Sequence, residues 1–199
     1  MNTRGLGLIA VSVALSLALE FMPLHLPFFP LSFDALDLGE IPIMLLAIYR
    51  GGREAMVGAV ILWLELNFIG GFVPIGPLFK LIALASAISG IELAIRVTRR
   101  MSAYSPYIIF AVSSAIRVLT AVLANYILVA FFMPGFLSYI APIFGVSVLL
   151  YYLFFTGIFN IIQNALSIFP ALIATRALIR SHTVKLERVF WKGQRENAW

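Results

Sequence analysis

A strongly apolar stretch of the sequence contains three amide side chains in only five residues, in the segment FNIIQNA of residues 159–165. Asn160, Gln163 and Asn164 have i, i+3 and i+4 spacing, so they share one face of a helix. An amide in hydrocarbon is unfavourable unless it finds a hydrogen-bond partner. Each amide offers both a donor and an acceptor, which suits the polar edge of a neutral heterocycle. The segment therefore predicts either one wall of a ligand site or amide bonding between helices, and for Asn164 bonding to a neighbouring helix remains open.

Other polar residues interrupt the apolar segments that precede this one: Glu65, Asn67, Lys80, Arg117 and Asn125. At about 1.5 Å of rise per residue, Asn125 is predicted in the outer half of the membrane, at a depth comparable to Asn160. Such a set favours a pocket that opens outward. We expect Glu65 and Lys80 to contribute to this pocket or to pair with each other, and Arg117 to pair with a carboxylate or to extend toward the interface.

The sequence offers little that would support catalysis. It contains no cysteine, and therefore no disulfide or thiolate site. It also lacks a G-x-x-x-x-G-K-[ST] phosphate loop, a G-x-S-x-G nucleophile motif and an H-E-x-x-H zinc motif. The two histidines, His25 and His182, are predicted in opposite aqueous regions, so they do not form a metal pair. We expect no enzymatic activity, no metal and no cofactor; a membrane enzyme is an alternative that lacks a nucleophile–base pair.

Composition places these polar residues in a membrane. Hydrophobic residues make up 62% of the 199-residue chain and charged residues only 12%, whereas a soluble protein is about one-quarter charged. A signal peptide at the N-terminus is less favoured than a retained helix, because no small-x-small cleavage site follows it. We predict an all-α membrane protein with six transmembrane helices, at about 5–23, 39–50, 54–70, 76–97, 106–132 and 146–179. The second is short and must be tilted, half-buried or extended by its flanks.

The distribution of basic residues sets the predicted orientation. With a cytoplasmic N-terminus, the inside segments 1–5, 50–53, 96–105 and 176–199 hold twelve of the 14 Lys and Arg residues, and the outside connections hold none. Both termini are therefore predicted to be cytoplasmic. Residues 1–180 are predicted to form one transmembrane domain, and residues 181–199 a basic and aromatic tail at the membrane surface. The net charge of +5 thus indicates contact with membrane lipid and not with nucleic acid.

A strip of small residues marks the first helix. Ala10, Ala14 and Ala18 recur every four residues, which lets another helix approach closely. That helix could belong to the same bundle or to a partner protein.

The first outside connection is rich in proline and aromatic residues. Its three prolines between residues 23 and 30 exclude a regular helix there. We expect this connection to lie over the top of the bundle, where Phe28, Phe29 and Phe33 could pack on the ring of a ligand.

In their order and spacing, these segments resemble the substrate-binding (S) component of the energy-coupling factor (ECF) vitamin transporters, nearest the riboflavin-type members. The resemblance covers most of residues 5–180. It includes the Ala-x-x-x-Ala strip, the Pro-rich first connection and the segments FDALDLGEIPIMLLAIYRGGREAMVGA, VPIGPLFKLIA, LANYILVAFFMP and FNIIQNAL.

The resemblance implies a set of site residues. Riboflavin-type proteins hold the flavin ring with an Asn of a helix 5 "NY" motif, an Asn of a helix 6 "FN" motif and a Lys three residues later. The matching positions here are Asn125, Asn160 and Gln163, so Gln replaces Lys and keeps a donor without its charge. Glu65 stands near a place where Lys is expected, and RGGREAMVG replaces a Gly-Pro-x-x-x-Gly turn.

The resemblance also implies a function and partners. It predicts a multi-pass protein of a prokaryotic cell membrane that captures a vitamin from outside, riboflavin first, and delivers it with a transmembrane T component and two ATPases. The strip of Ala10, Ala14 and Ala18 would meet the T component. One alternative is the same scaffold with thiamine, pantothenate or a modified-base (queuosine) precursor as cargo. Another is a stand-alone secondary carrier, with Glu65 as its ion-coupling acid.

Overall fold

The computed structural model describes residues 3–22, 26–28, 31, 35–70, 72–98, 104–144 and 147–180. This part of the chain is almost entirely helical, as the composition predicts. In chain order its elements are α1 (Thr3–Glu20), β1 (Leu26–Pro27), β2 (Ala35–Leu36), α2 (Ile41–Tyr49), α3 (Gly52–Ile69), α4 (Ile75–Thr98), α5 (Ser105–Ile127), the π-helix η1 (Leu128–Phe132), α6 (Gly135–Phe144) and α7 (Val148–Arg180).

Within the described residues, four helices are long and apolar enough to cross a membrane: α1, α4, α5 continued by η1, and α7. The protein is therefore consistent with a multi-pass membrane protein. The nine-residue α2 rises only about 13 Å, less than half the thickness of a bilayer core. Seven of its nine residues are buried, so this short segment is an interior helix of the bundle.

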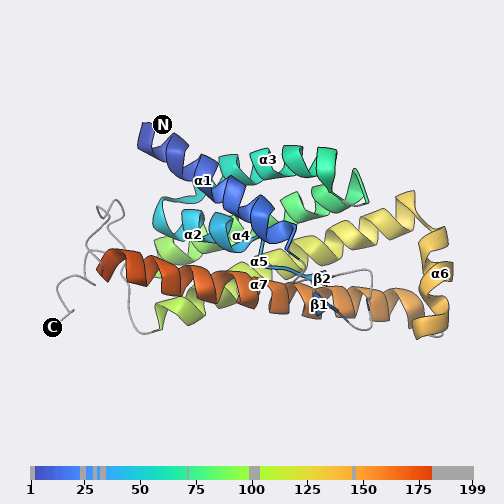
Figure 1. Ribbon diagram of the computed structural model, residues 1–199. Coiled ribbons are helices and arrows are strands. Elements are labelled where there is room, and N and C mark those ends of the chain that lie inside the picture. The colour runs from blue at the N-terminus through green and yellow to red at the C-terminus, as the bar shows by residue number, and fades with distance from the viewer. Residues whose placement is uncertain are drawn as a thin grey trace.

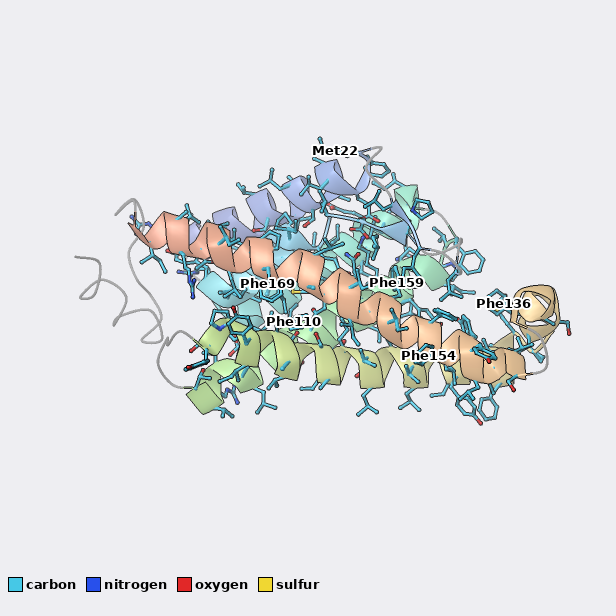
Figure 2. The ribbon with its side chains drawn as sticks, turned by 90° about the horizontal axis from the view of Figure 1, so that it is seen from below. Met22, Phe110, Phe136, Phe154, Phe159 and Phe169 are labelled. Atoms are coloured by element: carbon cyan, nitrogen blue, oxygen red, sulfur yellow. The ribbon has the colours of Figure 1, made fainter. Side chains whose placement is uncertain are left out.

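The helices pack as one bundle along a common axis. The beginning of α1 and the end of α7 lie at one end of the bundle, and α6 lies across the opposite end (Figure 1). Helix α5 packs between α4 and α7, while α2 packs on α1, α3 and α7. The rings of Phe110 in α5 and Phe169 in α7 face each other with centroids 5.2 Å apart (Figure 2).

Helices α4 and α5 approach each other closely, and α7 bonds to the same segment of α5. A Cβ atom added at Gly90 of α4 would lie 2.5 Å from the Cα atom of Ser113 in α5, so only glycine fits there. The Asn164 side-chain amide of α7 donates to the hydroxyls of Ser113 and Ser114, at 3.3 and 2.9 Å. Asn164 therefore bonds a neighbouring helix, which confirms the packing interpretation of this residue.

Two connections between the long helices contain regular structure. Strands β1 and β2 pair antiparallel, with Leu26 opposite Leu36, so the described part of the first connection is extended and not helical, as its prolines predict. Helix α6 occupies residues for which sequence analysis predicted only an outside connection, 133–145. Its ten residues are mostly apolar but too few to be recognised as a span.

Candidate functional site

A cavity of about 840 Å³ lies in the bundle among α4, α5, α7 and the residues that lead into α2. Its volume is within the range of about 300–1,000 Å³ that is usual for small-molecule sites. Residues at i, i+4 and i+8 of α5 line one side, namely Arg117, Ala121 and Asn125. A stripe of α7 lines the facing side, namely Tyr152, Thr156, Phe159, Asn160 and Gln163. The structure thus brings Asn125, Asn160 and Gln163 together around one space.

A buried ion pair closes one part of this cavity. The Arg117 guanidinium donates two hydrogen bonds to the Glu40 carboxylate, with N–O distances of 2.6 and 2.8 Å. It also donates from Nε to the Asn160 side-chain oxygen at 3.0 Å, and Ser167 donates to Glu40 at 3.0 Å. Arg117 and Glu40 are only 1% and 2% exposed. The prediction that Arg117 pairs with a carboxylate is confirmed, and Asn160 is held in place by that pair.

Lys80 forms a second charged cluster on the cavity wall. Its ammonium pairs with the Glu20 carboxylate and lies 3.1 Å from Asp37 Oδ2. The predicted pair of Glu65 with Lys80 is wrong, because Lys80 faces the end of α1 and the first connection. Glu65 lies outside this cavity.

Gln163 of α7 holds the first connection by two hydrogen bonds. Its side-chain oxygen accepts the backbone N–H of Asp37 at 3.2 Å, and its side-chain nitrogen donates to the Asp37 carbonyl at 2.9 Å. The Asp37 carboxylate in turn accepts the N–H of Gly39 at 2.8 Å. Gln163 therefore both lines the cavity and positions the segment that carries Asp37 and Glu40.

Asn125 lines the cavity one turn before η1. Its side-chain nitrogen donates to the Ala121 carbonyl at 2.9 Å, and its oxygen accepts the Tyr152 hydroxyl. A primary amide has two donor hydrogens and two acceptor lone pairs. Each of these contacts uses one of two places, so among the described residues one donor and one acceptor of Asn125 remain for a ligand.

Of the three predicted aromatic residues, the structure describes Phe28 alone; Phe29 and Phe33 lie outside the described residues. Phe28 packs edge-on against Phe159, with ring centroids 5.5 Å apart. Phe159 lines the cavity itself, as does Phe136 of α6. Figure 2 shows Phe159 near the middle of α7 and Phe136 at the end of the bundle where α6 lies. Phe28 thus supports a cavity-lining ring.

Five further residues line the cavity although the sequence did not predict them there: Glu20, Asp37, Glu40, Tyr152 and Thr156. The acidic segment FDALDLGE contains Asp37 and Glu40. Its carboxylates were the one feature of the sequence that could have pointed to these two cavity residues. Because that segment was interpreted as an outside connection, a return of Asp37 and Glu40 into the bundle was not predicted.

A second, smaller cavity of about 480 Å³ lies between α1 and α3. Ala10, Ala14 and Glu65 are among the residues that line it, and Ala10, Ala14 and Ala18 are all exposed. The Glu65 Oε2 atom is buried without a hydrogen-bond partner among the described residues. Among the described residues, the predicted partner strip therefore lies on an exposed face of α1, and Glu65 of α3 lies beside it at the second cavity.

Replacing Gln163 with leucine is expected to release the first connection from α7, because both hydrogen bonds to the Asp37 backbone are lost. Amide hydrogen exchange at residues 35–39 should become at least about fivefold faster, since each bond contributes about 1 kcal/mol. Ser167→Ala is the control, because Ser167 contacts Glu40 and not the Asp37 backbone. Unchanged exchange in the Gln163 variant would show that other contacts hold this segment.

Comparisons with known proteins do not identify the chain. No protein-family model matches it, and no curated protein matches it either.

Proposed function

We propose that this chain is the vitamin-capturing S component of an ECF-type importer in a prokaryotic cell membrane, with riboflavin as its ligand. The observation that carries the proposal is the cavity of about 840 Å³. Its lining contains Asn125, Asn160 and Gln163, the three positions that the resemblance to riboflavin-type proteins assigns to ring binding. They come from α5 and α7, which face each other across the cavity.

The proposal includes six spans with both termini in the cytoplasm. Helix α3 and the short interior α2, which its flanking residues would have to extend, are the other two spans of this proposal beside the four long apolar helices. The bundle end that carries α6 faces outward by the distribution of Lys and Arg. The cavity then opens toward the outer side. Capture from outside requires this orientation.

The cavity offers binding groups for both the ring and the hydroxyl groups of a flavin. Asn125 presents a free donor and a free acceptor toward the polar edge of the ring, and Phe159 and Phe136 offer aromatic surface. Lys80 has three donor hydrogens and two carboxylate partners, which leaves one hydrogen for a ligand hydroxyl. No side chain of this set needs to react with the vitamin.

Delivery would depend on partners. The sequence contains no phosphate loop, so we assign the energy source to two ATPases and a transmembrane T component. The exposed strip of Ala10, Ala14 and Ala18 is the surface on which we place the T component, because small residues allow close helix approach. Reorientation of the loaded protein by this complex would release the vitamin inward.

One observation favours thiamine as a second candidate. Three carboxylates and two cations line the cavity among the described residues, namely Glu20, Asp37 and Glu40 against Lys80 and Arg117. A cationic vitamin would neutralise the excess negative charge. The stand-alone carrier gains no comparable support, because its coupling acid Glu65 lies outside this cavity.

Purified protein is expected to quench the fluorescence of added riboflavin with saturation, and Asn125→Ala to weaken this binding about tenfold. The loss corresponds to one or two neutral hydrogen bonds. Asn67→Ala is the matched control, because Asn67 also donates to the carbonyl four residues before it but does not line the cavity. Its affinity should equal that of the wild type.

The same titration decides between the candidates. Failure of the wild-type protein to bind riboflavin would contradict the riboflavin proposal. Competition of thiamine for the site, with no saturable riboflavin signal, would assign the cavity to the second candidate. Equal affinity of the Asn125 and Asn67 variants would return Asn125 to a packing role.

A further inference from the structure

Thr156 is a buried polar side chain on the cavity wall that the contacts described above leave unused. It lies on α7 between Tyr152 and Asn160, one turn from each, and lines the same cavity. Thr156 is only 3% exposed. Among the described residues that line the cavity, it is the one whose buried side-chain oxygen has no hydrogen-bond partner.

Other threonines of the bundle make a backbone hydrogen bond that Thr156 lacks. Thr98, Thr120 and Thr175 each donate to the backbone carbonyl four residues earlier, at 2.8, 2.8 and 2.7 Å. This bond is the usual solution for a threonine inside an apolar helix. Thr156 does not make it, although Thr156 and Thr175 lie on the same helix and both are buried.

Neither neighbouring side chain on α7 bonds the Thr156 hydroxyl. The Asn160 amide donates to the Thr156 carbonyl at 2.9 Å, and the Tyr152 hydroxyl donates to Asn125. A buried hydroxyl without a partner costs about 1–3 kcal/mol, so a residue at this position is favoured only if something else bonds it. The Oγ1 atom itself is buried while Thr156 lines the cavity, so a turn of the side chain about its Cα–Cβ bond would bring the hydroxyl to a bound molecule.

We propose that the Thr156 hydroxyl is a ligand-binding group, which donates a hydrogen bond to a carbonyl oxygen or ring nitrogen of the bound heterocycle. The inference rests on the proposed function and adds a specificity-determining residue to it. The pattern of Tyr152, Thr156 and Asn160 at four-residue spacing places this hydroxyl in the polar stripe of α7. Its donor hydrogen selects a ligand with an acceptor at that point over an analogue with a C–H group there.

The experiment compares Thr156→Val, Thr156→Ser and Thr175→Val in riboflavin titrations and in thermal unfolding without ligand. Valine keeps the shape of threonine and removes the hydroxyl. We expect Thr156→Val to bind riboflavin about fivefold more weakly, and Thr156→Ser within about twofold of the wild type. Without ligand, Thr156→Val should melt no lower than the wild type, whereas Thr175→Val should melt lower, because only Thr175 loses a protein hydrogen bond, and should keep wild-type affinity.

Each outcome decides one question. Equal affinity of Thr156→Val and wild type would overturn the inference while the proposed function stands. A lower melting temperature of ligand-free Thr156→Val, with an affinity loss that serine does not rescue, would also overturn it, because the role would then be structural. No riboflavin binding by the wild-type protein would overturn the proposed function and this inference with it.

Discussion

Replacing Arg117 with methionine is expected to lower the free energy of unfolding by about 3–5 kcal/mol. The change removes three hydrogen bonds, two to the Glu40 carboxylate and one to Asn160. It leaves the carboxylate buried in a low-dielectric interior with Ser167 as its remaining donor among the described contacts. Desolvation of the unpaired charge accounts for most of the expected loss. Chemical or thermal unfolding in detergent measures it.

Two further variants isolate the charge effect. The double variant Glu40→Gln/Arg117→Met should recover at least half of the lost stability, because a neutral amide is buried at a much lower cost than a carboxylate. Glu54→Gln removes one charge of the Arg50–Glu54 pair, 3.3 Å apart at i, i+4 spacing, whose side chains are 5% and 18% exposed. It should cost less than Arg117→Met, because the amide oxygen can still accept the Arg50 hydrogen bond. A loss below about 1 kcal/mol in Arg117→Met would show that water reaches Glu40.

The apolar segments were predictable because bilayer spans need length and composition, and both are read directly from the chain. The shared face of Asn160, Gln163 and Asn164 was predictable for a similar reason, since i, i+3 and i+4 spacing fixes the direction of side chains within one helix. The outcome for Asn164 illustrates the limit. Spacing shows that the three amides are neighbours, but not which of them faces another helix and which faces the cavity.

Residue spacing in the sequence did not determine which side chains of different helices and connections would meet. Glu65 and Lys80 have similar predicted depths, yet the rotation of α3 about its axis turns Glu65 toward α1 and the second cavity. Depth along a helix follows from residue counting, whereas rotation depends on packing with the whole bundle. The partners that Lys80 does contact, Glu20 and Asp37, come from a helix end and a connection, where periodic patterns carry no signal.

The charges on the cavity wall lead to the second large prediction. Riboflavin 5′-phosphate is expected to bind about two to three orders of magnitude more weakly than riboflavin. Both cations of the described lining are already paired, Arg117 with Glu40 and Lys80 with Glu20 and Asp37. The five groups leave one excess negative charge. Two unit charges about 8 Å apart repel by about 2 kcal/mol at an effective dielectric constant near 20, and a phosphate carries nearly two charges at neutral pH.

Competition titrations with the two flavins measure this preference, and carboxylate variants locate its origin. Glu20→Gln removes the excess charge and leaves Lys80 paired with Asp37. The phosphate penalty, which is the ratio of the Kd for riboflavin 5′-phosphate to the Kd for riboflavin, should therefore fall at least about tenfold, while the affinity for riboflavin changes little. Glu65→Gln is the matched control, since this carboxylate lies outside the cavity, and it should leave the penalty unchanged. Equal affinity of wild-type protein for both flavins would mean that a cation turns from its carboxylate to the phosphate. Such exchange would make Lys80 the responsible group, because its partners hold it by single contacts, whereas Arg117 is held by a bidentate pair.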